Sequence, residues 1–246
     1  MALEPHAMLA IALIFFAGGL VKGTVGFGLP TIGIGLGALV LDIPTAMMLI
    51  AVPTILTNAW QIRINGHPSQ LPRHFWVFLL AAFIPIPLGI AILVMVPEFP
   101  YERLLGAVIL LYSLWSLLIT DRALPWLARW RWAVLAGGTN AVLTGLTGCF
   151  SVPGVMYLRG LGLDKSLLLA AMGLLYLVSA LGMWAALAAL GQSTVTLGLA
   201  SLAACVPVGA GVLLGNQLHR RLSEAMFRRI FLWVFASIGV ALLVAG

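Results

Sequence analysis

One lysine lies inside a long apolar stretch of the chain, in surroundings that could bind an anion. Lys22 belongs to GGLVKGTVGFGLP, residues 18–30, where closely spaced glycine and proline residues interrupt a helix. A lysine within a membrane costs several kcal/mol unless it lines a cavity or meets a partner. We therefore expect Lys22 to face a polar cavity and to attract a small anion.

A second glycine-rich stretch, residues 137–153, reads GGTNAVLTGLTGCFSVP and carries neutral hydrogen-bond donors. Broken backbone within a bilayer is tolerated only where protein or a watery cavity receives its polar groups. The helix that restarts after each proline presents free N–H groups and a positive dipole end, which suit an anion. We predict that both breaks meet near the bilayer midplane and bind one anion together. The predicted substrate-binding residues are Lys22, Gly23, Thr24, Gly26, Phe27, Gly28, Asn140, Thr144, Gly145, Thr147, Gly148, Cys149 and Ser151.

Several polar residues near these breaks have a second interpretation. Threonine and serine hydroxyls also cap broken helices and donate to nearby carbonyls, so both roles stay open for each of them. Cys149 is either a soft contact for the ligand or a small buried side chain, which is the commoner role. Asn58 and Gln61 either complete the cavity wall or join helices. The same two roles are open for Tyr176 and Ser179 in the second half of the chain.

The composition indicates a polytopic membrane protein. Of its 246 residues, 62% are hydrophobic and 8% are charged, whereas an average soluble domain has roughly 45–50% apolar and 25% charged residues. Apolar segments follow one another without a soluble module between them, so we expect one integral domain over residues 1–246. The net charge of +6 comes from basic residues scattered between these segments. We read them as topology signals and expect no nucleic-acid partner.

The apolar arm after the first break is too short to cross a bilayer. The twelve residues 30–41 reach only about 18 Å as a helix, against a hydrocarbon core of about 30 Å. We therefore expect each break to join two short arms of a re-entrant hairpin that returns to the same side. The alternative is one full span over residues 7–30 followed by a loop helix, which leaves Lys22 hard to explain.

The chain contains an internal repeat. Asp42 matches Asp164 after a shift of 122 positions, and the same shift aligns further glycine, proline and glutamate residues. One constant shift over most of both halves indicates a duplication. We place repeat one at about residues 7–120 and repeat two at about residues 129–243.

Equivalent loops of the two repeats carry different charges. The loop of residues 63–73 is basic, whereas its counterpart around residues 191–194 is uncharged. This pattern predicts that the second repeat is inserted upside down. The loops predicted to be cytoplasmic are 63–73, 121–131, 159–165 and 219–229, which leaves both termini periplasmic.

These observations define the predicted fold class. We expect an all-α polytopic membrane protein with two inverted-topology repeats. Each repeat has a re-entrant, broken-helix hairpin plus three transmembrane helices, which makes about 8–10 membrane segments. No group of side chains suits an enzyme, because the seven acidic residues lie at segment edges or in loops. No cofactor and no metal site are predicted.

The two breaks resemble those of the sulfite exporter TauE/SafE family of membrane transporters. GLVKGTVGFGLP and NAVLTGLTGCFSVP carry the resemblance, and the later turns LDIPTAMM and LDKSLLLA support it over nearly the whole chain. The resemblance implies transport of sulfur oxyanions and organosulfonates across a bacterial inner membrane. Both copies depart from the family's consecutive glycines before the proline. The bulkier Phe27 and Phe150 could shape the cavity for a particular anion.

We therefore expect a secondary transporter that moves a small sulfur-containing anion, such as sulfite or sulfoacetate, by alternating access. An anion channel or uniporter of the same fold is the alternative. A membrane enzyme or a structural partner protein has less support. The expected partners are the small anion and the lipid bilayer, and the residues leave a homo-oligomer open.

Overall fold

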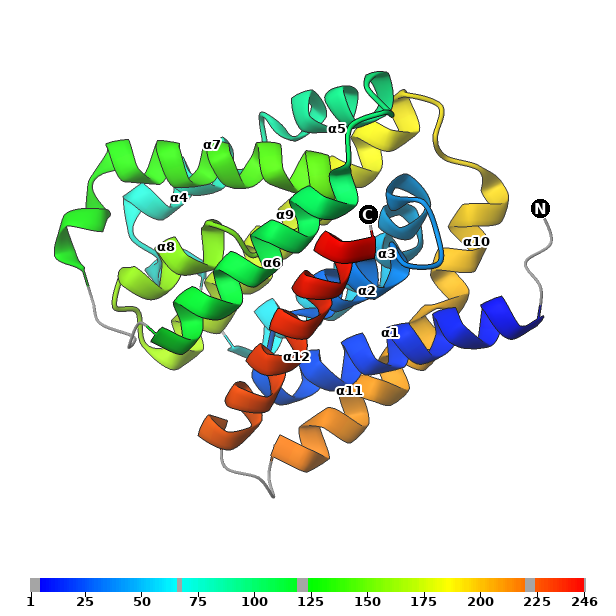
Figure 1. Ribbon diagram of the computed structural model, residues 1–246. Coiled ribbons are helices and arrows are strands. Elements are labelled where there is room, and N and C mark those ends of the chain that lie inside the picture. Colours follow the sequence, from blue (N-terminus) through cyan, green and yellow to red (C-terminus); the bar gives the residue numbers. More distant parts are fainter. Residues whose placement is uncertain (1–4, 66–67, 119–123, 220–223, 246) are drawn as a thin grey trace.

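The computed structural model describes residues 5–65, 68–118, 124–219 and 224–245, and these residues are mostly helical (Figure 1). Asp121, Arg220 and Arg221, which contribute to the predicted loop charges, lie outside the described residues. The first half contains α1 (Pro5–Val25), α2 (Leu29–Gly37), α3 (Ile43–Asn65), η1 (Pro68–Gln70), α4 (Arg73–Ala81), α5 (Ile86–Met95) and α6 (Tyr101–Leu118). The second half contains η2 (Pro125–Ala128), α7 (Trp130–Thr147), α8 (Gly154–Gly160), α9 (Lys165–Ala189), α10 (Val195–Ala203), α11 (Cys205–His219) and α12 (Glu224–Ala245).

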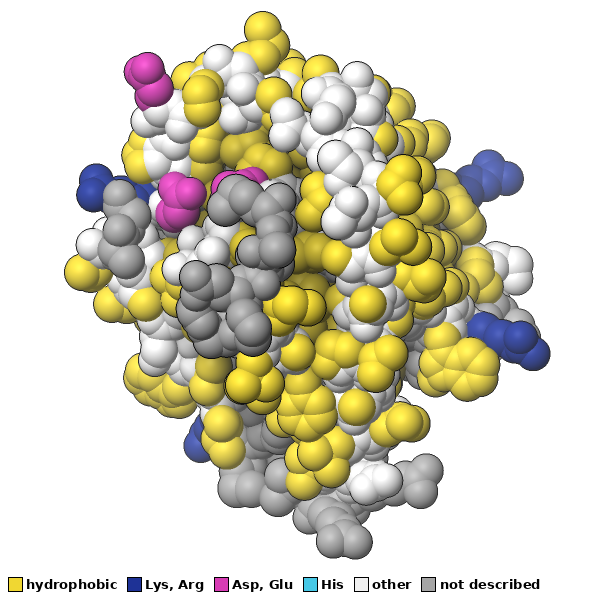
Figure 2. Space-filling view, turned by 90° about the vertical axis from the view of Figure 1, so that its right-hand side faces the viewer, with side chains coloured by type: hydrophobic (Ala, Val, Ile, Leu, Met, Phe, Trp, Pro, Cys, Tyr) yellow, Lys and Arg dark blue, Asp and Glu magenta, His cyan; other side chains and the backbone are white. Residues whose placement is uncertain are grey.

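The predicted all-α membrane fold is confirmed. Within the described ranges, six helical stretches are long and apolar enough to cross a membrane. Two of these stretches are interrupted helices, since α4 continues into α5 and α10 continues into α11. Hydrophobic side chains cover most of the face shown in Figure 2, and most of its charged groups lie near the margins.

The helices recur at the predicted shift. Both ends of α10 lie 122 positions after the corresponding ends of α4, and α9 begins 122 positions after α3. Equivalent helices also pack in pairs, because α3 contacts α9 and α6 contacts α12. Figure 1 shows α6 and α12 running in opposite directions beside each other. Other contacts between the halves join α1 to α11 and α7 to α4 and α5.

Each helix break is shorter than the glycine-rich stretch that contains it. The chain leaves α1 only at residues 26–28, where Gly26 and Gly28 have φ angles of 85° and 97°. Gly148 ends α7 with a φ angle of 70°. Side-chain-bearing residues rarely adopt this left-handed backbone region, so glycine is needed at these positions.

The arm before the first break is therefore longer than the sequence predicted. At 21 residues, α1 is about 31 Å long and can cross a membrane alone, whereas α2 has 9 residues and cannot. The reason lies in two other glycines of this stretch, which face α11. A Cβ atom on Gly19 or Gly23 would overlap the backbone of Val208 or Val212. These glycines bring two helices into close contact and leave α1 unbroken.

Candidate functional site

Lys22 lies in the last turn of α1 and is held by two amide side chains of α3. Its ammonium Nζ donates to Asn58 Oδ1 at 2.7 Å and to Gln61 Oε1 at 3.0 Å. Asn58 and Gln61 lie three residues apart, so they share one face of the helix. The Lys22 side chain is only 5% exposed. A buried cation is therefore held by two uncharged acceptors.

The amide groups of Asn58 and Gln61 are themselves fixed in orientation. Asn58 Nδ2 donates to the carbonyl oxygen of Thr54 at 2.8 Å, and Gln61 Nε2 donates to that of Leu169 at 2.7 Å. An amide that donates through its nitrogen presents its oxygen on the opposite side. Both oxygens are thus aimed at Lys22 before any ligand binds.

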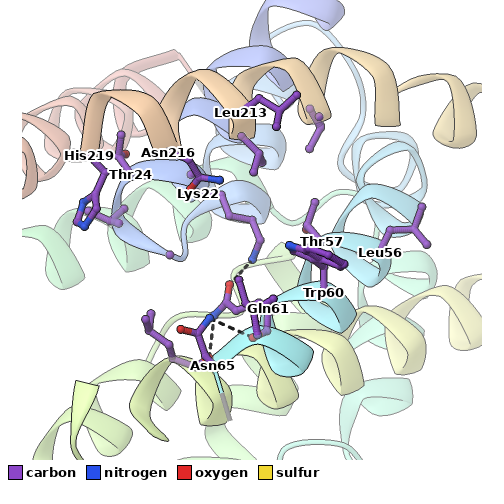
Figure 3. Close-up of a pocket in the computed structure, with 18 of the residues that line it drawn as sticks. Lys22, Thr24, Leu56, Thr57, Trp60, Gln61, Asn65, Leu213, Asn216 and His219 are labelled. Atoms are coloured by element: carbon purple, nitrogen blue, oxygen red, sulfur yellow. Dashed lines mark hydrogen bonds between the residues drawn. The ribbon is translucent and has the colours of Figure 1, made fainter. Parts of the chain in front are cut away.

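Lys22 opens on a cavity of about 540 Å³ between α1, α3 and α11, which also reaches the start of α9. We call this cavity the first groove. Figure 3 shows Lys22 extending from α1 toward Gln61, with Trp60 on α3 and Asn216 on α11 nearby. Asn65, Lys165 and His219 line the groove where α3 ends, α9 begins and α11 ends. Of the described residues that line the groove, none is acidic.

The first break contributes four of its predicted site residues to this groove, namely Lys22, Gly23, Thr24 and Gly26. Thr24 Oγ1 donates to the carbonyl oxygen of Val21 at 2.8 Å, which is the capping role left open by the sequence. Phe27 and Gly28 do not line the groove. The Phe27 ring instead packs edge-on against Phe231, with centroids 5.8 Å apart, and the guanidinium of Arg159 lies 5.4 Å from its centroid.

The predicted polar residues of the second break bond within the protein and do not line the first groove. Asn140 Oδ1 accepts from the backbone N–H of Gly154 at 3.0 Å, at the start of α8. Thr144 Oγ1 donates to the carbonyl oxygen of Cys149 at 3.3 Å, and the Cys149 N–H donates to Thr147 Oγ1 at 3.2 Å. These contacts stabilise the broken backbone between α7 and α8.

Gly145 and Gly148 serve packing around the second break. A Cβ atom on Gly145 would lie 2.6 Å from the carbonyl oxygen of Ile86 in α5. One on Gly148 would overlap the side chain of Ile34 in α2. The second break is therefore closely covered by helices of the first half.

The two breaks meet through a chain of hydroxyl groups. Thr31 Oγ1, in α2, lies 3.2 Å from Ser151 Oγ, and Ser151 Oγ lies 2.8 Å from the hydroxyl of Tyr176 in α9. All three side chains are buried. The structure thus brings Thr31 and Ser151 together, whereas Lys22 faces the first groove. An anion bound jointly by both breaks stays a prediction.

The sequence profile of the sulfite exporter TauE/SafE family matches residues 10–242, which include both breaks and the first groove. The chain belongs to the sulfite exporter TauE/SafE family. A search of curated proteins and a search of solved structures each found no match. Family membership confirms the resemblance seen in the two breaks. It implies that this TauE/SafE protein is a membrane transporter of sulfur anions.

Sequence reasoning missed part of the groove wall of this TauE/SafE protein. Trp60, Asn65 and Asn216 were not among the predicted site residues, yet all three line the groove. A signal was present in α3, where Asn58, Gln61 and Asn65 recur every three or four residues in an apolar helix. This spacing places polar groups on one face of the helix.

Proposed function

We propose that this TauE/SafE protein is a secondary transporter that moves a small sulfur-containing anion by alternating access, with Lys22 binding the charge of the anion. One observation carries the proposal: a buried ammonium with two neutral acceptors opens on the first groove. An ammonium has three N–H donors, so one is left for a ligand. Bringing a buried charge together with an opposite charge offsets part of its desolvation cost.

The walls of the first groove support an anion that carries an organic part. Leu56, Trp60 and Leu213 line the groove beside the polar residues of α3. The sulfonate of a compound such as isethionate or sulfoacetate would accept from Lys22, and its carbon atoms would contact these apolar side chains. Sulfite would use the same charge contact without the apolar one.

The location of the polar residues around the first groove supports access from the cytoplasm. The groove reaches the end of α3, the start of α9 and the end of α11, next to the loops predicted to be cytoplasmic. Basic residues in such loops favour the cytoplasmic side. On this basis we propose an inward-open state with both termini periplasmic. The family resemblance implies that the membrane is a bacterial inner membrane.

An equivalent groove in the second half would provide the opposite access route. The residues of α1, α3 and α11 that line the first groove have counterparts 122 positions away in α7, α9 and α5 with the turn before it. We call the space between these elements the second groove. There, side-chain atoms of Phe83 and Ile86 lie 3.0 Å and 2.9 Å from where a Cβ atom on Gly182 would be, so they fill the space beside Gly182. A filled second groove beside an open first groove suits a carrier with inverted repeats, in which each groove opens in turn.

Uptake into proteoliposomes tests the proposed role of Lys22. We would compare wild type with Lys22→Met for labelled sulfite, isethionate and sulfoacetate. A hydrogen bond to a charged group contributes about 1.5–3 kcal/mol, so uptake should fall roughly 10- to 150-fold. The melting temperature should change little, because removal of the buried charge offsets the cost of leaving the oxygens of Asn58 and Gln61 without their donor.

Arg103→Met is the matched control, since Arg103 is an exposed cation on α6 outside the groove. It should transport like wild type. Equal uptake by Lys22→Met and Arg103→Met would remove Lys22 from the mechanism. Single-channel currents from the wild type would replace the carrier with an anion channel.

A further inference from the structure

Lys22 has no charged partner among the described residues, although it is buried within a membrane helix. Its acceptors are the neutral oxygens of Asn58 and Gln61. The ionisable side chains on the groove wall are Lys165 of α9 and Cys205 and His219 of α11, and none of these supplies a carboxylate.

Among their described side chains, the other elements packed around this end of α1 supply no carboxylate to the groove either. α2 has no ionisable side chain, and Arg229, the ionisable one among the described side chains of α12, is exposed. Arg159 of α8 lies over Phe27, and Arg63 of α3 is exposed outside the groove lining. Asp164, the N-cap residue of α9, is exposed and does not line the groove. Among the described side chains of these elements, none therefore gives Lys22 a carboxylate partner.

A buried ammonium in this setting can become electrically neutral in two ways. It can pair with a bound anion, or it can release its proton to the water of the groove as a neutral amine. Lysine is suited to the second route, because its proton can leave when the side chain is buried. Both neutral forms avoid moving an isolated charge through the low-dielectric interior of the bilayer.

We propose that Lys22 is also the proton-binding site of the transport cycle, so that one proton moves with each monovalent anion. The proposal rests on the proposed function. In the loaded step, the amine takes one proton from the groove, the ammonium pairs with one anion, and the neutral pair is carried across. On the far side the anion and the proton both leave, and the neutral amine returns. The net movement is one anion and one proton in the same direction.

The chain offers an internal control for this proposal, because Lys22 and Lys165 are its two lysines. Acetic anhydride acylates neutral amines and not ammonium groups, so the pH profile of labelling reports the proton on each lysine. Peptide mass spectrometry would follow both residues in the purified, folded protein. Lys22 should become reactive at a lower pH than the exposed Lys165, and added isethionate should shift only the Lys22 profile toward higher pH. Identical profiles, or a Lys22 that reacts only at higher pH, would overturn the proposal.

Proteoliposomes with a trapped pH dye test the coupling directly. With the membrane potential clamped, isethionate added outside should acidify the lumen of wild-type vesicles in proportion to its uptake. Lys22→Arg keeps the positive charge but cannot release it, since a guanidinium stays protonated. This variant should exchange labelled for unlabelled isethionate and should show no net uptake with protons.

The outcomes separate the coupling from the transport function. Wild-type uptake of isethionate without lumen acidification overturns the coupling and leaves the transporter standing. Absence of uptake of sulfite, isethionate and sulfoacetate by the wild type counts against the proposed function itself. Net uptake with acidification by Lys22→Arg places the proton on another group. If Lys22→Arg loses exchange as well, the labelling profiles of the wild type decide whether Lys22 binds the transported proton or only the anion.

Discussion

Trp60 and Cys205 line the first groove, and their counterparts 122 positions away are Gly182 and Phe83 in the second groove. In the first groove these positions border a cavity of about 540 Å³. In the second, the Phe83 ring reaches to 3.0 Å from where a Cβ atom on Gly182 would lie. The same helical plan therefore has two packings in one molecule, one open and one filled.

The first groove also has polar side chains where the second groove has smaller or apolar ones. Lys22, Asn58 and Gln61 correspond to Thr144, Ala180 and Met183. The second groove thus lacks both the cation and the two amide oxygens that orient it. The two halves thus share a helical framework, whereas the proposed charge site lies in the first half alone. Variants in both halves can test this difference in charge and packing.

The largest expected effect comes from placing an internal anion beside Lys22. Asn58→Asp puts a carboxylate where the amide oxygen lies 2.7 Å from Lys22 Nζ. The new carboxylate would neutralise the ammonium and compete with the substrate. We expect uptake of isethionate to fall roughly 100-fold, which corresponds to about 2.7 kcal/mol.

Asn58→Ala is the comparison for this variant, because it installs the residue type found at the counterpart position 180. It removes one acceptor and keeps the charge of Lys22, so its loss should be smaller, roughly tenfold. Equal losses in the two variants would show that Asn58 acts through packing and not through the charge of Lys22.

An intermediate effect is expected where α7 packs on α5 beside the second groove. Gly145→Ala places a methyl group 2.6 Å from the carbonyl oxygen of Ile86 and 2.7 Å from Gly89 Cα. Overpacking of this kind lowers the free energy of unfolding by about 1–3 kcal/mol. The thermal midpoint in detergent should fall accordingly.

Gly138→Ala is the matched control on the same helix, since no atom of a neighbouring element lies within 4 Å of where its methyl group would be. Its midpoint should stay or rise, because alanine favours the helix interior over glycine. A Gly145→Ala protein as stable as Gly138→Ala would contradict the close packing of α7 on α5.

The smallest effect is expected at the hydroxyl contact between the breaks. Ser151→Ala removes contacts to Thr31 and Tyr176, at 3.2 Å and 2.8 Å. Hydrogen bonds between membrane helices contribute about 0.6 kcal/mol on average, so stability should fall slightly and uptake should stay within about threefold. A much larger loss of uptake, with normal stability, would support the sequence prediction that Ser151 contacts the anion.

Much of the fold followed from the sequence, because helical membrane segments and a constant repeat shift are both local patterns. The 122-position shift recurs in the bounds of α4 and α10, and Lys22 lies beside a cavity, although apolar side chains form much of the cavity wall. The shift can be read from the identities of single residues. The position of Lys22 beside a cavity follows from the free-energy cost of one charge within a membrane. Two roles were open for Asn58 and Gln61 from residue type: Gln61 lines the groove, whereas Asn58 does not line it and bonds Lys22 and the carbonyl oxygen of Thr54.

The location of the groove could not be derived in the same way. Gly19 and Gly23 look like helix breakers in the sequence, yet they pack against α11 and place the groove between α1, α3 and α11. Which helix fills the space beside a glycine depends on contacts between residues nearly 190 positions apart, as for Gly23 and Val212. The partners of Lys22, 36 and 39 positions away, depend on the same packing.

Cysteine accessibility at one pair of equivalent positions tests directly whether the first groove is open while the second groove is closed. Thr57 lines the first groove, and its counterpart Ser179 is fully buried. Each would be changed to cysteine in a protein that lacks Cys149 and Cys205, and treated with a cationic methanethiosulfonate. We expect Thr57→Cys to react at least roughly tenfold faster than Ser179→Cys, because the state with an open second groove is a minor population. Isethionate should slow the Thr57→Cys reaction. Equal rates, or faster labelling of Ser179→Cys, would contradict an open first groove beside a closed second groove.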